Sequence, residues 1–586
     1  MIQGNPAVAL GRRLRRLVGP GARPVTGLVP RSAADRVQDL EDRSTAIALG
    51  PLARRTGRRT DPGVAVLSAA ADHPLVAAVR EVWPQARLTV VDPTRGEAET
   101  HVALAAAGTL EAIWDVEADE RRPERVREVF PHLADGGVLV VLDAGTDAGA
   151  GSPAVADTQA LVDLGATLLR AGLAPGAGVR ADDVRLAELV DSVAVRGRHL
   201  VLTARTRGPQ RLAKLREEEV ADYLARTGER AGRVLLERPG SVVDSPAPVR
   251  FSESEAAPAY RTHFEAPPLQ LREYAGATCS TGQVVTLDRV LLPETYRHNY
   301  RPRLGNRFTV EVAPRFARVK KPMPPEDLPG SWFHLDSEFR GHFGHAMTEQ
   351  ISRLWAWQEA KERYPDLKAL MLVNKARTTI GEWEYRLYEA AGVAREDLVL
   401  FDHPVRPERL VAATPMFSQP AYVHDGIREV YRRIGDDLAA DAPRRDYPER
   451  IFCSRRHEKR SATNTTQVEE FFAARGFEIV YPEDFPMAEQ VQMFRSATDL
   501  AGFAGSAMFT MAFVPEPKRV ILVSAETYVA QNEAMIAAVQ GHQVNVAWCR
   551  PEFRRPDGTE IGRKLQARFT FDDAREGEFL RRVLDT

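Results

Sequence analysis

The stretch that most constrains the fold is 496–524, whose pattern predicts a strand, a glycine turn, a short helix and a second strand. Gly502 and Gly505 can adopt positive φ angles, so a ligand can approach the backbone closely between them. The predicted helix, 507–513, would point its free N–H groups at the turn, with Ser506 as its cap. This arrangement suits a phosphate, although an ordinary strand–helix–strand corner has the same glycines.

A cluster of cations lies upstream of this turn. The run 451–460 ends a predicted strand at Ser454 and brings four basic side chains to one loop. Such a density of positive charge suits a diphosphate, whereas the alternative is a solvated basic loop. The candidate phosphate-binding residues are therefore Ser454, Arg455, Arg456, Lys459, Arg460, Asn464, Gly502, Gly505, Ser506 and Ala507.

The stretch 332–357 contains a glycine bend followed by a predicted helix from about residue 345 to 360. The helical repeat would place His345, Glu349 and Arg353 on one face and bury the opposite face. A histidine in the first turn behind a glycine bend is expected to project into a cleft, where the carboxylate one turn later can hold it as a base. The alternative is a surface charge series with a capping histidine.

The order of motifs in 451–524 resembles the C-terminal part of glycosyltransferase family 61. The shared features are a Ser-Arg-Arg run, a later asparagine, a Gly-Phe before a strand, a Gln-x-x-x-Phe-x-x-Ala helix and a glycine turn. The family also has an aromatic-Gly-His motif with an acid four residues on, which falls here on His345 and Glu349, and then an Arg-Leu-Trp run, here 353–355. Two positions depart from the family pattern: Ala504 replaces a common histidine and Thr510 a common asparagine.

The resemblance, which we extend over about residues 265–550, implies an α/β fold with a GT-B-like pair of Rossmann-like domains. An acceptor-side domain would span 265–440 and a nucleotide-sugar donor domain 445–550. The ten candidate residues above would then bind the sugar donor, and neither a metal nor another cofactor is expected. Direct displacement with inversion at the anomeric carbon is implied.

The resemblance also assigns the acceptor side of the reaction. His345 or Glu349 would be the base that takes the proton of the acceptor hydroxyl, and Asp336 is a third candidate. His342 and Arg353 would lie near the acceptor. The implied enzyme is a hexosyl- or pentosyltransferase that moves a sugar from a nucleotide-sugar to a glycan or other hydroxyl acceptor, in cell-surface or capsular polysaccharide synthesis. The alternative from another class is a catalytically silent carbohydrate-binding or scaffold protein.

Residues 60–205 alternate strand and helix signals, with strands expected at 64–67, 87–91, 112–115, 138–142 and 199–203. This order resembles a degenerate class I methyltransferase-like Rossmann domain, with Asp92 at the position of the ribose-binding acid. After the first strand, however, the sequence 68–72, SAAAD, stands where those enzymes carry a glycine-rich loop. Close approach of S-adenosylmethionine to the backbone is therefore not expected. Methyl transfer is less favoured than either sugar transfer or a silent carbohydrate-binding or scaffold role.

The remaining segments complete a chain of 586 residues, long enough for two to four domains. They are an Arg/Pro/Gly-rich N-terminal arm at 1–58, a helix and linker at 206–264, and a C-terminal tail at 551–586 with a terminal helix at 573–584. A formal net charge of −2 provides no overall field for binding nucleic acid.

Composition also bears on the compartment. Three widely spaced cysteines support neither a disulfide framework nor a cysteine zinc site. Neither a signal peptide nor a run of ~18 apolar residues is found. These features predict a cytoplasmic protein with at most peripheral contact at the inner face of the membrane.

Overall fold

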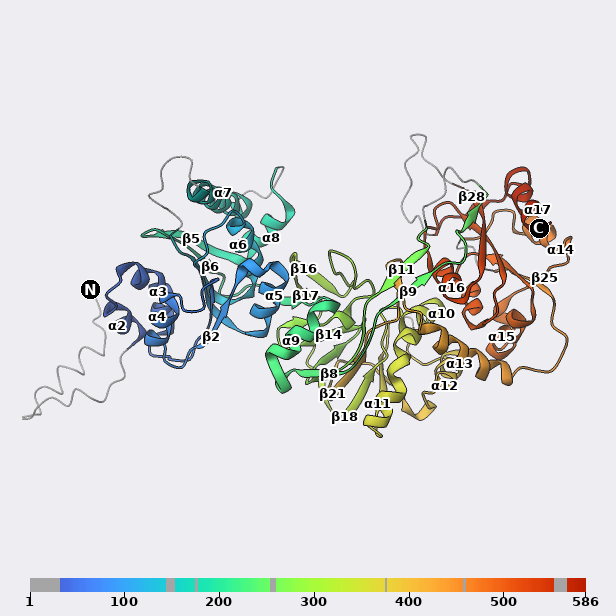
Figure 1. The fold of residues 1–586 in the computed structure, drawn as a ribbon, viewed down its shortest axis with the longest axis horizontal. Coiled ribbons are helices and arrows are strands. Elements are labelled where there is room, and N and C mark those ends of the chain that lie inside the picture. Colours follow the sequence, from blue (N-terminus) through green and yellow to red (C-terminus); the bar gives the residue numbers. More distant parts are fainter. Residues whose placement is uncertain are drawn as a thin grey trace, which may run out of the picture.

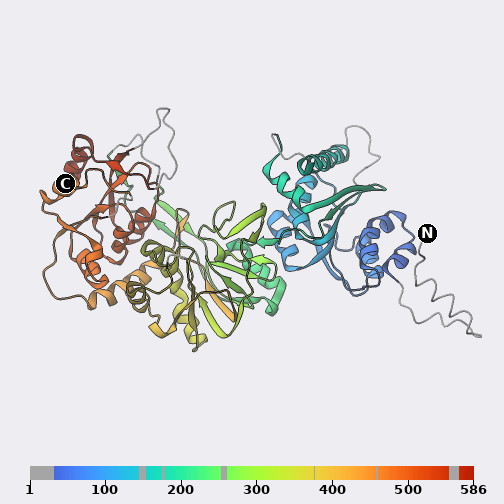
Figure 2. The ribbon, with the colours of Figure 1, turned by 180° about the vertical axis from the view of Figure 1, so that it is seen from behind.

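The structure is a computed structural model that describes residues 32–143, 153–173, 178–252, 260–374, 377–456, 460–552 and 566–585. It is a mixed α/β protein whose described residues form three large sheets, arranged one after another along the molecule (Figure 1). The N-terminal sheet lies at one end, the central sheet in green and yellow follows, and the C-terminal sheet lies at the other end. The view from behind has the same order (Figure 2). No helix within the described ranges is long and apolar enough to cross a membrane.

The N-terminal sheet has the strand order β2-β1-β3-β4-β6-β5. Its first four strands are parallel, and β6 runs antiparallel to both β4 and β5. All five strands expected from the apolar runs are present, which confirms those predictions. The strands are β1(Gly63–Leu67), β2(Arg87–Val91), β3(Leu110–Asp115), β4(Leu133–Val141), β5(Val190–Arg196) and β6(His199–Ala204).

Helices cover both faces of this sheet. Alternate residues of β1 point to opposite faces, so Ala65 and Leu67 join one core while Val64 and Val66 join the other. A strand buried on both faces in this way is typical of a parallel sheet. The helices of the first face are α5(Glu97–Ala106), α6(Arg122–Val129), α7(Pro153–Leu173) and α8(Ala181–Leu189), and α4(Pro74–Val82) lies on the second.

Two further helices correct the expectation of an arm over 1–58. α2(Ala33–Gln38) and α3(Arg43–Thr56) pack their apolar residues into the second core. Ser32 caps the first helix in a capping box with Asp35, and Asp42 caps the second. The basic composition hid this pattern, because arginines stand at both ends of α3 and its buried apolar stretch lies between them. Residues 1–31 of the predicted arm lie outside the described residues.

The central sheet runs β16-β17-β7-β15-β14-β13-β21-β18-β19-β20, with β12 and β8 pairing beside β21. Its end β21-β18-β19-β20 is parallel. The strands are β7(Leu212–Lys214), β8(Gly232–Arg238), β12(Leu269–Ala275), β13(Thr278–Ser280), β14(Val284–Leu287), β15(Val290–Leu291), β16(Thr309–Ala313), β17(Phe316–Val319), β18(Glu326–His334), β19(Lys368–Leu372), β20(Leu398–Phe401) and β21(Val405–Ala413).

The segment 206–264 is more than the expected helix and linker. It contains α9(Val220–Thr227), but β7 and β8 belong to the central sheet. β10(Arg250–Phe251) pairs in parallel with the edge of the C-terminal sheet, and β9(Ser241–Asp244) pairs with β11(His263–Ala266). β7, β9 and β10 have only three, four and two residues, so a charged and proline-rich sequence does not reveal them.

The C-terminal sheet has the order β10-β28-β27-β26-β24-β25, all parallel, with β29 antiparallel on β28. Its strands are β24(Arg450–Cys453), β25(Glu478–Val480), β26(Asp499–Phe503), β27(Arg519–Ala525), β28(Gln543–Pro551) and β29(Phe569–Thr570). The helices of the central and C-terminal parts are α11(Trp357–Arg363), α12(Glu382–Ala390), α13(Ile427–Ala440), α14(Thr465–Ala473), α15(Met487–Ser496), α16(Asn532–Gln540) and α17(Glu578–Leu584).

One hydrophobic core joins the central and C-terminal sheets. It includes Phe333 of the central sheet, Ile434 of α13 and Leu500 of β26. The terminal helix predicted at 573–584 is present, but α17 packs on its own sheet, where Leu580 shares a core with Phe503 and Ile521. This helix therefore completes the C-terminal sheet's own core.

Candidate active site

The glycine turn lies at the carboxyl end of β26, in the interior of the C-terminal sheet, where parallel sheets bind their ligands. Gly505 has a φ of 141° and begins a 3₁₀ helix, η10(Ser506–Phe513), without a side-chain cap. Ser506 therefore does not cap the helix as predicted, although it and Ala507 are partly exposed at its start. Gly502 serves packing, because a Cβ there would lie 2.7 Å from Sδ of Met508.

Two of the predicted cations, Arg455 and Arg460, face this turn. Nη2 of Arg455 donates to the carbonyl of Ala504 at 2.8 Å. A Cβ on Gly505 would lie 3.4 Å from Nη2 of Arg460 and 3.5 Å from Nη2 of Arg455. Burial and the neighbouring Arg460 lower the pKa of Arg455 to about 10. Two guanidinium groups so close together favour a bound anion, which would relieve their repulsion.

A carboxylate, Glu533, lies beside the same turn. The hydroxyl of Tyr528 donates to it at 3.2 Å. Burial raises the pKa of Glu533, opposed by its own backbone N–H, by Arg460 and by the backbone N–H of Gly505. Nε of Arg460 is buried without a hydrogen-bond partner in the described part of the chain. Glu533 thus takes up hydrogen-bonding capacity that a phosphate oxygen would use at this helix start.

Two other predicted phosphate ligands point away from the turn. Arg456 forms two hydrogen bonds of 2.6 Å with the carboxylate of Asp484 and stacks on Tyr481 at the surface. The hydroxyl of Ser454 donates to Glu469 at 2.5 Å. Both placements correct the expectation, and they follow from the strand end, where successive side chains point to opposite sides.

Asn464 has a structural partner as well. Its amide nitrogen donates to the carbonyl of Phe571 at 2.8 Å, and its oxygen accepts from the N–H of Phe571 at 3.1 Å. These bonds fix the C-terminal segment against the start of α14, so Asn464 does not face the turn, contrary to the prediction. Lys459 lies outside the described residues.

The helix predicted at 345–360 is a composite of three helix types. α10(Phe343–His345) continues as a π-helix, η6(Ala346–Gln350), then as a 3₁₀ helix, η7(Ile351–Ala356), and ends as α11. The predicted apolar residues are buried, but so are Glu349 and Arg353 on the face expected to be polar. A π-helical turn in such a segment is frequent at functional sites, because it re-aims side chains within a packed helix.

His345 and Glu349 form a contact within this segment. Nδ1 of His345 lies 2.7 Å from Oε1 of Glu349. The carboxylate also accepts from Nε of Arg297 at 2.6 Å and from the hydroxyl of Ser337 at 2.7 Å. Burial acts to raise the pKa of Glu349, but His345 and Arg297 outweigh it and hold that pKa well below its usual range. Glu349 is therefore ionised, and it holds the side chains of His345, Arg297 and Ser337 together.

The imidazole of His345 is oriented by its neighbours. Because the ionised Glu349 only accepts hydrogen bonds, Nδ1 of His345 donates to it, and Nε2 is the ring nitrogen left for another partner. Phe339 stacks on the ring with centroids 4.5 Å apart. Within the described ranges Nε2 makes no hydrogen bond, and a fifth of the His345 side chain is exposed. This geometry suits a proton acceptor.

The start of this helix lies directly against the glycine turn. A Cβ on Gly344 would be 3.0 Å from Cβ of Ser506 and 3.2 Å from the ring of Phe509. The exposed His342 lines a cavity of about 540 Å³ together with Arg307 and Arg377. The fold therefore brings the two predicted motifs together, although about 150 residues separate them in the sequence.

Asp336 and Arg353, by contrast, are structural. Asp336 is buried and accepts from the backbone N–H groups of Gln283 at 3.1 Å and Leu372 at 3.2 Å. Burial raises its pKa to about 6 despite these bonds. Arg353 is also buried, and it donates to the carbonyl of Asp336 at 3.0 Å. These placements correct the expectations of a third base and an acceptor-side arginine.

Sequence reasoning did not find Arg297, Ser337, Phe339 or Glu533. Arg297 lies in an irregular segment 52 residues before Glu349, so no local spacing connects them. Ser337 and Phe339 lie in the stretch 332–357, but a serine or a phenylalanine does not by itself indicate a role in a site. Glu533 is an acid in the first turn of a helix, which is a common and usually electrostatic feature.

The corresponding edge of the N-terminal sheet is filled by the protein itself. The buried carboxylate of Asp115, at the end of β3, lies 3.0 Å from Nε of Arg125. The N–H of Ala69 donates to Glu117 at 2.6 Å. Asp92 accepts from the N–H of Thr94 and caps a short 3₁₀ turn. Side chains of this domain thus take the positions where a cofactor would meet the backbone.

Comparison with known proteins places the motifs in a family. Residues 343–521 match the family model Glycosyltransferase 61. This segment, about a third of the chain, is therefore similar to the glycosyltransferase 61 family. It contains the helix of His345, the cation loop and the glycine turn, which confirms the resemblance stated above. The glycosyltransferase 61 match supports sugar transfer as the general activity.

Solved structures give weak likenesses to methyltransferases. Two are MycE methyltransferase from the mycinamycin biosynthetic pathway, one in complex with Mg and SAH and one with Mg, SAH and mycinamycin VI. Each is 13% identical and covers 25% of this chain, with TM-scores of 0.20 and 0.19. The chain spans 46% of the length of these methyltransferases. No curated protein matches the chain.

Proposed function

We propose that this protein transfers a sugar from a nucleotide-sugar to a hydroxyl acceptor by a single inverting displacement. The observation that carries the proposal is the contact of Gly344 with Ser506, which sets the His345 dyad beside the glycine turn. The central and C-terminal sheets would then act as the acceptor and donor halves of a GT-B-like pair, with the N-terminal sheet as a third Rossmann-like domain. A boundary near 445 suits this division, whereas the central sheet already begins with β7, well before residue 265.

The donor diphosphate would bind at the start of η10. The N–H groups of this helix start and the guanidinium groups of Arg455 and Arg460 would meet its charge, so the leaving group needs no divalent ion. Glu533 would move aside or be protonated when the diphosphate enters. The adjacent exposed His342 and the cavity lined by Arg307 and Arg377 would accept the other substrate.

His345 would act as the base. Nε2 takes the proton of the acceptor hydroxyl, the acceptor oxygen bonds to the anomeric carbon, and the bond from that carbon to the diphosphate oxygen breaks. Both electrons of that bond leave with the nucleoside diphosphate, near Arg455 and Arg460. Glu349 stays ionised and stabilises the imidazolium, as its hydrogen bond to Nδ1 allows. The choice of hexose or pentose, and a role in capsular or other surface polysaccharides at the cytoplasmic face of the membrane, are further parts of the proposal.

A catalytically silent carbohydrate-binding or scaffold protein is the second candidate. One observation favours it: Glu533 engages the Gly505 N–H and Arg460, the groups that a diphosphate would need. The two candidates differ in whether the turn can exchange this carboxylate for a phosphate, and nucleotide binding therefore separates them.

The experiment is calorimetric titration of the full chain with UDP and GDP in the presence of a chelator. We expect one of them to bind, and Glu533→Gln to strengthen binding because it removes the competing charge. Arg460→Ala should weaken binding by about 1.5–3 kcal/mol, the scale of a charge-assisted hydrogen bond. Arg456→Ala is the matched control in the same loop, because Arg456 pairs with Asp484 instead. Binding of neither nucleotide, or equal effects of both arginine variants, would favour the silent protein.

A further inference from the structure

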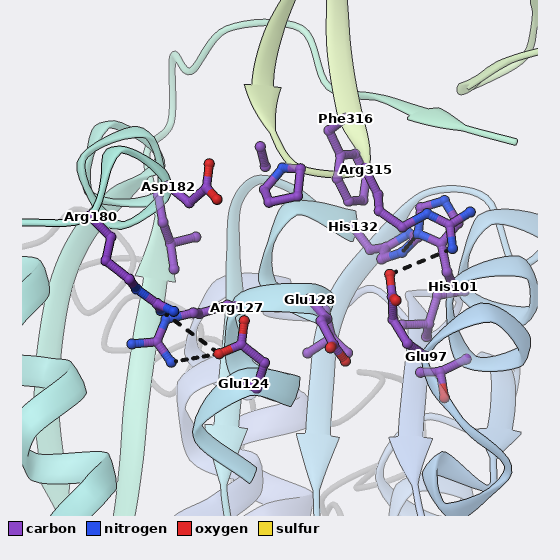
Figure 3. A pocket seen from close by; sticks show the side chains of 16 residues that line it. Glu97, His101, Glu124, Arg127, Glu128, His132, Arg180, Asp182, Arg315 and Phe316 are labelled. Carbon is purple, nitrogen blue, oxygen red and sulfur yellow. Dashed lines mark hydrogen bonds and ion pairs between the residues drawn. The ribbon is translucent and has the colours of Figure 1, made fainter. Parts of the chain in front are cut away.

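A second cavity, of about 190 Å³, lies between the N-terminal domain and the central sheet. Helices α5, α6 and α8 form one side, and the turn of the β16–β17 hairpin closes the other (Figure 3). None of its lining residues belongs to the candidate active site. A cavity of about 150 Å³ lined by apolar groups can hold a benzene ring, so this one has room for about six to ten non-hydrogen atoms.

Two buried histidines form a hydrogen-bonded chain in its wall. Nε2 of His101 lies 3.2 Å from the carbonyl oxygen of Lys214, and Nε2 of His132 lies 3.1 Å from Nδ1 of His101. A carbonyl only accepts, so Nε2 of His101 carries a proton. Both rings are neutral, because burial, aided by nearby cationic side chains, lowers the pKa of His101 far below its usual value and that of His132 to about 3.

The chain of donors and acceptors sets the tautomer of His132. Since neutral His101 is protonated on Nε2, its Nδ1 must accept, and Nε2 of His132 must donate. Nδ1 of His132 is then a bare acceptor. Throughout the described residues it has no hydrogen-bond partner. His132 lines the cavity, so a ligand there with an N–H or O–H group could satisfy this lone pair.

The charged side chains of the cavity also leave an excess of acceptors. Its arginines are paired with acids: Nη1 of Arg127 lies 3.1 Å from Glu124, and Nη1 of Arg315 lies 3.6 Å from Glu97. The carboxylate of Glu128 lies between these groups (Figure 3). One of its oxygens accepts from Nη2 of Arg121 at 3.1 Å, and the other makes no hydrogen bond within the described residues. Burial raises the pKa of Glu128, and the negative charges of Glu97 and Glu124 add to this effect. A cation would relieve the crowding of these carboxylates.

The rest of the wall is apolar. Phe316, at the start of β17, makes edge contacts with both histidine rings, with centroids 4.7 and 5.4 Å away. Leu104, Leu186 and Pro314 complete this side. The cavity thus combines an apolar wall with carboxylate and imidazole acceptors, as a site for a small amphipathic cation requires.

We propose that this cavity binds a small organic amine, whose protonated amino group donates to Glu128 and to Nδ1 of His132 and whose apolar part packs on Phe316. Because the hairpin belongs to the central sheet, the bound amine would contact both the N-terminal domain and the proposed transferase. The site is separate from the glycine turn, and the proposal does not depend on the sugar-transfer activity.

Calorimetry on the full chain at pH 7.5 tests this proposal, with benzylamine as the probe and benzyl alcohol as its neutral counterpart. We expect benzylamine to bind about tenfold more tightly than the alcohol, as expected for one charge-assisted hydrogen bond. Glu128→Gln should remove about that tenfold difference. Glu188→Gln, on the exposed side of α8 in the same domain, should leave both affinities unchanged.

A second variant guards against a structural effect of the first. His132→Phe keeps a ring beside Phe316 but removes the acceptor nitrogen, so it should weaken benzylamine binding while benzyl alcohol still binds. No binding of benzylamine at millimolar concentration, equal affinity for amine and alcohol, or an unchanged preference in Glu128→Gln would each overturn the proposal.

Discussion

At the scale of single residues, the paired side chains of His345 and Glu349 decide how the proposed reaction can run. His345→Ala should lower turnover by about 10²–10⁴-fold, the usual contribution of a general base. Glu349→Gln should also lower it, because the amide can offer N–H to Nδ1 and favour the wrong tautomer. Nucleotide affinity should stay within a few-fold of the parent, since neither side chain contacts the turn. Donor hydrolysis and calorimetry measure the two quantities.

Asp336→Asn is the control for the turnover of these two variants. It keeps the shape of a buried side chain whose oxygens accept from two backbone N–H groups, so it should lower thermal stability and leave turnover unchanged. Near-parental turnover in His345→Ala would show that another group takes the proton. A variant that fails to fold would mean that His345 is a structural cap, and Glu349→Gln would then still test the dyad.

The contrast between His345 and Asp336 shows which residues a sequence can reveal. The His345–Glu349 contact is local, since four residues bring side chains together in any helical turn, and the structure has it at 2.7 Å. The burial of Asp336 depends on Gln283 and Leu372, which reach it from distant parts of the chain. Sequence spacing contains no information of that kind. The same limit hid Glu533, which meets the glycine turn only through the folded sheet.

At the scale of elements, the contact between α10 and η10 holds the two motifs in place. Gly344 is helical, so a side chain there brings no backbone strain, but its Cβ would press on Ser506 at 3.0 Å and on Phe509 at 3.2 Å. Gly344→Val should therefore push the helix from the turn at a cost of about 1–3 kcal/mol. We expect the variant to have a lower turnover in an activity assay and a lower Tm in a thermal scan.

Gly172→Ala is the matched control for this change. Gly172 lies in α7 with no atom within 4 Å of an added Cβ, so the variant should keep the parental Tm or raise it. If Gly344→Val keeps parental turnover, the two elements do not need this contact and the active site is arranged in another way.

Elements were predictable where the apolar pattern was strong. The buried runs of β1, β26 and β27 have the continuous apolar sequence of parallel strands, and all were expected. Helix type was not predictable, because the π and 3₁₀ turns of 346–356 depend on packing against both sheets. The short strands of 206–264 carry too few apolar residues to stand out, and the sheets that they complete lie far away in the sequence.

At the scale of the whole molecule, the N-terminal sheet is a mostly parallel α/β sheet whose own side chains occupy the carboxyl ends of its strands. Asp115 and Arg125 are buried together at the end of β3, and Glu117 takes the N–H of Ala69 after β1. A cofactor would have to displace a buried ion pair, and separating one such pair costs about 3–5 kcal/mol. The cavity under the β16–β17 hairpin is lined by other residues than these.

S-adenosylmethionine should therefore not bind the full chain. Besides the ion pair, Ala69, Ala70 and Ala71 place Cβ atoms where glycines would let a cofactor reach the backbone, so the loop would have to move before binding. Calorimetry should detect no heat at micromolar ligand, while the same sample binds UDP or GDP at the distant glycine turn and so proves to be folded. An affinity for S-adenosylmethionine in the micromolar range would contradict this, because it would require Glu117 and Arg125 to leave their partners, and it would make the chain a candidate for two group-transfer reactions at its two ends.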